Sequence, residues 1–191
     1  VAQHGPRHLL LLDRDESLLH DVATGPLAAA ETVLADICDQ VRIQDLFEHH
    51  RPDVVFHAAA QKHVPILERY PVEAVRTNVF GTWEMTRVAA PHLSAQQGNV
   101  VMITSLAGVR PVGSSVPYAA SKAALNHLTA LLANALGPDL RVNAIAPGLV
   151  ETPWTADWGV LHEAVGAMAP MRRSATPDDL VDVALLLATN T

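Results

Sequence analysis

The sequence predicts an α/β fold, in which one domain is built on a parallel β-sheet with helices on both faces. The chain has 191 residues, which is long enough for a single domain with a full core. Short continuous apolar runs, typical of buried parallel strands, alternate with segments of helical periodicity. Nearly half of the residues (49%) are apolar and only 4% are aromatic, so aliphatic side chains build the core. We therefore expect residues 1–191 to form one doubly wound α/β domain.

The individual elements follow from these runs and from the residues that interrupt them. Strands are expected at residues 8–13, 32–39, 53–60, 100–103 and 141–146. Helices are expected within residues 14–31, 41–53 and 61–90, around Tyr118 as far as Leu136, and from Thr176 onward. Arg51-Pro52 and Gly137-Pro138 are expected to end the second and fourth of these helices, because proline cannot continue a helix.

The chemistry of the chain is concentrated in residues 99–126. A short strand, a polar turn at Thr104-Ser105 and a loop lead into a helix that carries Tyr118 and Lys122. Positions four apart share one face of a helix, so the phenol and the ammonium point the same way. The chain has only two tyrosines, and such a pair arises by chance roughly 2% of the time. In so arginine-rich a chain, a lysine here indicates a need for a compact point charge.

This arrangement is suited to proton exchange with a substrate oxygen. A tyrosine near its usual pKa of about 10 is a poor base at neutral pH, and a cation within about 4–6 Å lowers that pKa. Ser105 precedes Tyr118 at the end of a strand, where its hydroxyl could hydrogen-bond the same oxygen. The pair alone leaves open a plain amphipathic helix with a partly buried tyrosine and a solvated lysine.

The set resembles the active site of the short-chain dehydrogenase/reductase family, which consists of a serine, a Tyr-x-x-x-Lys helix and an upstream asparagine. Residues 98–189 are similar to the ordinary single-domain members in the strings GNVVMITSLAG, PYAASKAALNHLTALLANAL, RVNAIAPGLVETP and PMRRSATPDDLVDVALLLAT. The resemblance implies a Rossmann-like fold and NAD(P)-dependent interconversion of an alcohol and a ketone. It assigns Tyr118 as the acid/base, Lys122 as the cation that lowers its pKa and holds the ribose, and Ser105 as the group that orients the carbonyl.

Residues 7–90 resemble another branch of the family, the nucleotide-sugar 4,6-dehydratases of polysaccharide biosynthesis. The matching strings are LLLLDRDES, RPDVVFHAAAQKHVP and EAVRTNVFGT. The last string holds Asn78, which matches the asparagine that kinks the helix and holds a water in the proton relay; a helix-interior asparagine bonded to backbone is the plain alternative. Dehydratases of that branch carry Asp-Lys where this chain has Leu106-Ala107. Nucleotide-sugar modification is therefore the runner-up function.

The resemblance also implies the contacts of the cofactor. Asp13 would accept hydrogen bonds from the adenosine ribose and slightly favours NAD, whereas the neighbouring Arg14 can receive NADP; a helix cap or turn is an equally good role for Asp13. The other contacts are expected from Asp36, Ile37, Ala58, Ala59, Tyr118, Lys122, Pro147, Gly148 and Thr152. Trp154 and Trp158 follow in the expected substrate loop, where they line an apolar pocket or pack beneath the loop.

Composition argues against several other functions. The net charge of −7 disfavours nucleic acid or an anionic membrane surface as a partner. The single Cys38 excludes an internal disulfide framework, and no signal peptide or membrane-length apolar run occurs, so we expect a cytoplasmic protein. The ten histidines show no established ligand spacing, so no metal is expected. A small-molecule substrate and, by resemblance, a homodimer or homotetramer are the expected partners.

Two parts of the family pattern are not found in the sequence. These are the glycine-rich turn that binds the pyrophosphate, together with the strand before it, and the last strand. We therefore expect a sheet truncated at both ends, with residues 8–13 and 53–60 facing each other across a gap. Three explanations are open: omitted residues, a truncated gene, or a smaller sheet in which LLLLD pairs with VVFHA; the first two are favoured. A non-catalytic relic kept for subunit assembly is a further alternative for the function.

Overall fold

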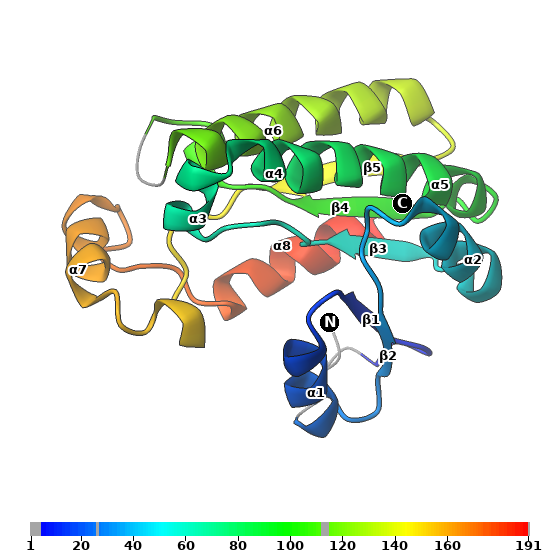
Figure 1. Cartoon of the computed structure of the whole chain (residues 1–191), viewed down its shortest axis with the longest axis horizontal. Helices are drawn as coiled ribbons and strands as arrows, with labels where there is room; N and C mark the ends of the chain where they lie inside the picture. The colour runs from blue at the N-terminus through cyan, green and yellow to red at the C-terminus, as the bar shows by residue number, and fades with distance from the viewer. Residues whose placement is uncertain (1–4, 26, 112–114, 191) are drawn as a thin grey trace.

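The computed structural model describes residues 5–25, 27–111 and 115–190 as two parallel sheets with helices between the strands (Figure 1). Strand β1 (Leu10–Asp13) pairs with β2 (Glu31–Leu34), and β3 (Val54–His57), β4 (Asn99–Ile103) and β5 (Arg141–Ile145) form the second sheet in that order. Every pairing is parallel. The expected Rossmann-like α/β class is confirmed.

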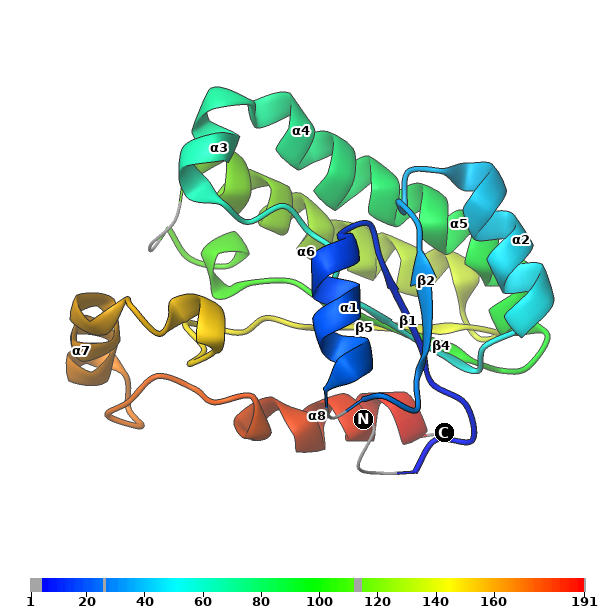
Figure 2. The ribbon, with the colours of Figure 1, turned by 60° about the horizontal axis from the view of Figure 1, so that its bottom comes forward.

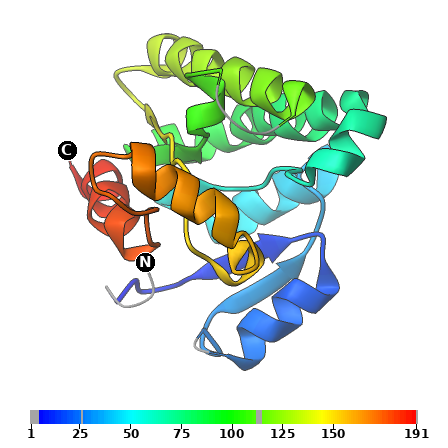
Figure 3. The same cartoon turned by 90° about the vertical axis from the view of Figure 1, so that its left-hand side faces the viewer.

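The helices connect these strands. They are α1 (Glu16–Thr24), α2 (Gln40–His50), α3 (Val64–Arg69), α4 (Pro71–Val75), α5 (Thr82–Ser94), α6 (Val116–Leu136), α7 (Gly159–Met168) and α8 (Asp178–Thr189). In Figure 1, α4, α5 and α6 cover one face of the three-stranded sheet and α8 covers the other. Figure 2 shows α1 lying alongside the β1–β2 pair. Helix α7 stands at one end of the molecule, apart from the sheets (Figure 1), and it lies toward the viewer in Figure 3.

The core lies between the three-stranded sheet and the helices above it. The central strand β4 is buried along almost its whole length because β3 and β5 flank it and helices cover both faces. The buried cluster comprises Ile43, Met85, Ala89, Ala90, Leu93, Val100, Met102, Leu132, Leu140 and Val142. Aliphatic side chains fill it, as the composition predicts.

Two expected strands are shorter than predicted. Residues 32–39 were expected to be one strand, but β2 ends at Leu34. The chain turns there because Asp36 Oδ1 accepts a hydrogen bond from the Cys38 N–H at 2.9 Å. Asp39 then caps α2 by accepting from the Arg42 N–H at 3.1 Å. Strand β3 likewise ends at His57, before the small residues.

The single helix expected over residues 61–90 is wrong. Helix α3 ends at Arg69, and α4 starts at Pro71, whose ring cannot continue the preceding helix. A π-helical turn then spans Arg76–Gly81, and α5 follows without a break. The widened turn contains Asn78, the residue at which the resemblance implies a kink.

Within the described residues, β1 forms ladder hydrogen bonds only with β2, and β3 only with β4. The alternative in which residues 8–13 pair with residues 53–60 is therefore wrong. Contact between the two sheets is through side chains: Leu12 of β1 packs against the core cluster. None of the described helices is long and apolar enough to cross a membrane.

Candidate active site

The candidate catalytic residues meet where β4 ends and α6 begins. Ser105 follows β4 and starts a short 3-10 turn over Leu106–Gly108, in which its Oγ accepts from the Ala107 N–H at 3.2 Å. The Leu106 N–H donates to the Pro147 carbonyl at 2.8 Å, which joins this turn to the segment after β5. Helix α6 is capped by Ser115, whose Oγ accepts from the Tyr118 N–H at 3.4 Å.

Gly108 brings the Ser105 turn into contact with α6. A Cβ atom at this position would lie 2.5 Å from the Lys122 carbonyl carbon and 2.6 Å from the Ala123 nitrogen. No side chain fits at such distances from backbone, so only glycine allows this approach. The close approach fixes Ser105 beside the face of α6 that carries Tyr118 and Lys122.

Lys122 is almost fully buried, with 3% of its surface exposed. Its ammonium donates to the Ile103 carbonyl at 2.9 Å and lies 5.8 Å from the centre of the Tyr118 ring. Burial lowers the pKa of Lys122 to about 8, because the charged form loses its hydration. The lysine is therefore a buried cation that stays mostly protonated at neutral pH.

The structure contradicts the expected lowering of the Tyr118 pKa. Burial raises the pKa of this phenol above its ordinary value, and a hydrogen bond with the Ser105 side chain only partly opposes the rise. The expectation failed because the same buried setting that brings the ammonium near also disfavours the phenolate. Tyr118 is consequently held as a neutral phenol at neutral pH.

Asn78 is fully buried and connects three parts of the site. Its Oδ1 accepts from the Gln61 N–H at 2.7 Å, and its Nδ2 donates to the Gln61 carbonyl at 3.1 Å. Its other amide hydrogen reaches Ser121 Oγ at 3.0 Å, and Ser121 donates to the Tyr118 carbonyl at 2.8 Å. The side chain therefore holds the segment after β3 against the first turns of α6.

His57, at the end of β3, is a buried polar residue that the sequence analysis did not assign. Its Nε2 is 2.7 Å from Thr82 Oγ1, and Thr82 donates to the Asn78 carbonyl at 2.9 Å. Burial and, to a smaller extent, the nearby charge of Lys122 lower the pKa of His57 to about 4. The imidazole is thus neutral and is linked through Thr82 to the backbone of the π-helical turn that carries Asn78.

The expected cofactor residues lie after the C-terminal ends of the strands. Asp13 ends β1 with its Oδ1 accepting from the Asp15 N–H at 3.0 Å, and Arg14 lies 3.7 Å from Asp36 in a half-exposed ion pair. Ile37 is buried. Ala58 and Ala59 are exposed after β3, Gly148 is exposed after Pro147, and Thr152 caps the short turn that follows. Each of them thus lies at the C-terminal end of a strand or in the segment that follows it.

Trp154 and Trp158 line a shallow pocket with Lys62, His63 and Pro65. The two indole rings are 4.6 Å apart, and the Lys62 ammonium lies 4.3 Å from the centre of a Trp154 ring. The sequence left two roles open for these tryptophans, pocket lining and packing beneath the loop, and the recess beside them contains a cation. Lys62 directly follows Gln61, whose backbone is hydrogen-bonded to the Asn78 side chain.

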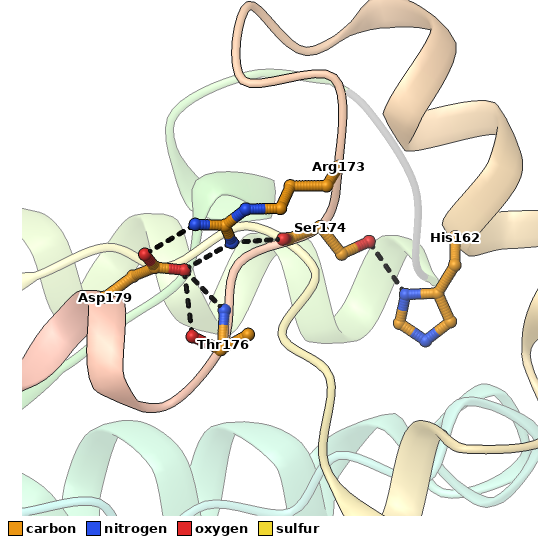
Figure 4. Close-up of polar contacts among 5 residues, drawn as sticks. All are labelled: His162, Arg173, Ser174, Thr176 and Asp179. Atoms are coloured by element: carbon orange, nitrogen blue, oxygen red, sulfur yellow. Dashed lines mark hydrogen bonds and ion pairs between the residues drawn. The ribbon is translucent and has the colours of Figure 1, made fainter.

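Two sets of polar contacts anchor the segment that carries these tryptophans (Figure 4). His162 of α7 reaches Ser174 Oγ at 2.7 Å through Nδ1 and the Thr155 carbonyl at 3.0 Å through Nε2. Arg173 makes a two-pronged contact with Asp179 at 2.6 and 2.8 Å. Hydrogen bonds from Arg173 and Thr176 hold the pKa of Asp179 well below its usual range.

The family is identified by the match of the whole sequence. A family model described as enoyl-(acyl carrier protein) reductase matches residues 2–191. The chain belongs to the short-chain dehydrogenase/reductase family. This short-chain dehydrogenase/reductase combines the site described above with a fold that its solved relatives share.

The similar proteins include a ketoacyl reductase and a polysaccharide biosynthesis protein, in line with the two branches of the family that the sequence resembles. The chain is 46% identical over 117 residues to granaticin polyketide synthase putative ketoacyl reductase 2 of Streptomyces violaceoruber, covering 59% of this chain and 47% of that protein. It is 34% identical over 95 residues to probable polysaccharide biosynthesis protein EpsC of Bacillus subtilis, covering 47% of this chain and 16% of that protein. The chain thus spans about half and about a sixth of the length of these two relatives.

Among solved structures, the fold is similar to that of a putative NAD(P)-dependent gluconate 5-dehydrogenase from Beutenbergia cavernae with bound NADP. The TM-score is 0.79 at 28% identity, over 95% of this chain and 79% of that chain. The similarity extends over nearly the whole chain, so the two separate sheets here correspond to parts of one known architecture.

The sequence pointed to the proposed catalytic residues but not to the residues that hold them in place. Ser121 lies between Tyr118 and Lys122, and its role as the link to Asn78 required knowledge of how the helices cross. Gln61 and Gly108 act through their backbones, which leave no chemical signature in a sequence. The GVRP stretch after Ala107 did signal a turn, but not its contact with α6.

Proposed function

We propose that this protein is an NAD(P)-dependent oxidoreductase that interconverts an alcohol and a ketone by hydride transfer. The proposal rests on one observation: Ser105, Tyr118 and Lys122 share one site at the C-terminal end of β4, with Asn78 tied to the same helix through Ser121. Asn78, Ser105, Tyr118 and Lys122 are the proposed catalytic set.

At neutral pH Tyr118 is a neutral phenol, which is the protonation state that carbonyl reduction requires. The neutral phenol donates its proton to the ketone oxygen, on which negative charge develops, and the Ser105 hydroxyl hydrogen-bonds that oxygen. In the reverse direction the phenolate accepts the proton of the alcohol, which requires higher pH. Lys122 supplies the positive charge that stabilises the phenolate formed after proton donation.

The residues present are compatible with a nicotinamide cofactor. In the described structure, Ile103 is the hydrogen-bond acceptor found for the Lys122 ammonium, which leaves two of its three N–H donors for a ribose. The small residues Ala58 and Ala59 leave the edge after β3 open to a ligand. The cofactor, when bound, supplies the hydride, while the protein orients the carbonyl and exchanges the proton.

Either nicotinamide dinucleotide is compatible with the residues at the end of β1. Asp13 favours NAD, whereas Arg14 offers a cation to the 2′-phosphate of NADP. The Arg14–Asp36 pair balances the local charge. The further cofactor contacts that we propose are Ile37, Pro147, Gly148 and Thr152.

Reduction of a ketoacyl compound by NADPH is the first activity to measure. The choice is supported by the similarity to a ketoacyl reductase, and oxidation of NADPH is followed by absorbance. We expect Tyr118→Phe to lower kcat/KM by about 10²–10⁴-fold, because the phenyl ring cannot donate a proton. Tyr70→Phe is the matched control, since Tyr70 is the other tyrosine of the chain and is exposed. Equal loss in both variants, or none in either, would refute the assignment of Tyr118.

Nucleotide-sugar modification is the second candidate, supported by the similarity to EpsC. Leu106 and Ala107 offer no acid or base for the elimination of water, which argues against a dehydratase. Incubation with a UDP-sugar and NAD tests this candidate. Turnover of the sugar nucleotide in the absence of ketone reduction would favour it over the leading proposal, and a folded chain inactive in both assays would favour a non-catalytic role.

We also propose that the protein forms a homodimer or homotetramer through α6 and its neighbouring helix. Exposed apolar side chains support this proposal: Phe80 in the π-helical turn, Trp83 in α5 and Leu131 in α6. Light scattering coupled to size exclusion measures the mass. A monomer at all concentrations would contradict the proposal.

A further inference from the structure

A second group of polar side chains lies at the opposite ends of β1 and β2 from the residues proposed to bind the cofactor. His8 comes just before β1, Glu31 is the first residue of β2, and His50 is the last residue of α2. The register that pairs Leu10 with Glu31 brings the first two together. Figure 2 shows α2 beside the β1–β2 pair, and the end of this helix completes the group.

The donor atoms of these three residues converge. His8 Nε2 is 2.9 Å from Glu31 Oε2, and His50 Nε2 is 3.7 Å from Glu31 Oε1. All three donor atoms lie within 4.8 Å of one another. Ligands at about 2.0–2.1 Å from a tetrahedral zinc ion are about 3.3 Å apart, and the two contacts above bracket that separation.

We propose that His8, Glu31 and His50 bind one zinc ion. Two imidazole nitrogens and a carboxylate oxygen are ligands that zinc takes in proteins, and three of them leave the fourth position of a tetrahedral ion to water. Mg²⁺ and Ca²⁺ prefer oxygen ligands throughout, so the donor set selects against them. The side chains of His8 and Glu31 are half exposed, so the open position is accessible to water.

The ion would join the weakly held β1–β2 pair to α2, which packs into the core. Helix α1 has no buried residue, and none of the β1 residues is fully buried. Zinc bound between the approach to β1, the start of β2 and the end of α2 would tie this pair of strands to a helix that packs on α5. The role is structural and does not depend on the oxidoreductase activity proposed above.

Sequence spacing could not have revealed this site, and the sequence analysis expected no metal. His8 and Glu31 are 23 residues apart and meet only through strand pairing. His50 has a histidine neighbour, His49, which packs edge-on against it with ring centres 4.7 Å apart. Adjacent histidines on a helix point in different directions, so the pair itself is no ligand motif.

The test is calorimetric titration of the full 191-residue chain with ZnCl₂ after treatment with a chelator. We expect one zinc ion per chain and a rise in the unfolding temperature when zinc is added. His8→Asn, Glu31→Gln and His50→Asn should each weaken binding at least about ten-fold. His20→Asn is the matched control, because His20 is an exposed histidine on α1 away from this group.

Circular dichroism first establishes that each variant is folded, and Co²⁺ replaces zinc in a second titration. Stronger visible absorption than that of aqueous Co²⁺ is expected, because a four-coordinate site absorbs more than a six-coordinate one. Unchanged zinc binding in the three ligand variants would overturn the proposal. So would the absence of saturable binding to the unaltered chain, in which case the three side chains form only a hydrogen-bonded group.

Discussion

Strands β1 and β4 have similarly apolar sequences but very different surroundings. In β4, Val100, Val101 and Met102 are fully buried, because β3 and β5 flank the strand and helices cover both faces. In β1, the leucines are only partly buried, and β2 is the strand's one ladder partner among the described residues. An apolar run therefore predicts a parallel strand, whereas the depth of its burial depends on neighbours that the run does not specify.

The largest expected difference between the two regions is in the cost of removing a leucine. Leu93→Ala, at a fully buried position of the core cluster, should lower the free energy of unfolding by about 2–5 kcal/mol. Leu11→Ala, the same change in β1, should cost about 1 kcal/mol, because the side chain is only partly buried. Urea denaturation measures both. Equal costs would mean that the β1–β2 pair is as tightly packed as the core.

Substitution of Lys122 tests how much a buried charge lowers the free energy of unfolding of the well-packed region. Its pKa falls from 10.5 to about 8 on folding, so the unfolded chain binds the proton more tightly. Burial of the charged ammonium therefore lowers the free energy of unfolding by about 3 kcal/mol below pH 8, and this loss disappears as the pH rises towards 10.5. Lys122→Met should therefore stabilise the fold by about 1–3 kcal/mol at pH 7, after the loss of the bond to Ile103 is subtracted.

The stability gained by Lys122→Met should shrink as the pH rises from 8 towards 10.5. Urea denaturation at several pH values measures this change. Lys62→Met is the control, because Lys62 is exposed and is the other lysine of the chain. A stability gain that does not vary with pH would show that packing of the methionine, and not removal of the charge, is responsible. Loss of activity alongside increased stability would identify Lys122 as a residue retained for function.

The smallest effect is expected for the ion pair beyond β1. Arg14 and Asp36 are about half exposed and 3.7 Å apart, so water screens their attraction. Arg14→Gln should change the free energy of unfolding by no more than about 0.5 kcal/mol, measured by urea denaturation in low salt. A larger loss would indicate that this exposed region depends on its charges more than its geometry suggests.

The sequence predicted the fold class, the order of the elements and the position of the Tyr118 helix, because each depends on local patterns of apolar residues, glycine and proline. It did not predict the division of residues 61–90 into separate helices, although Pro71 was visible, because the stability of short helices depends on tertiary packing. It also misjudged the pKa of Tyr118. The spacing to Lys122 gives proximity but not burial, and burial decides the direction.

The two hydrogen bonds between the Asn78 side chain and the Gln61 backbone have a consequence for hydrogen exchange. Gln61 lies in an irregular segment between β3 and α3, where an amide would ordinarily exchange quickly with deuterated solvent. Its N–H is bonded to a fully buried asparagine that is itself tied to α6. Deuterium can replace this hydrogen only after the hydrogen bond to Asn78 opens. We therefore expect the Gln61 amide to exchange as slowly as the amides of the neighbouring helices, although Gln61 lies in a loop.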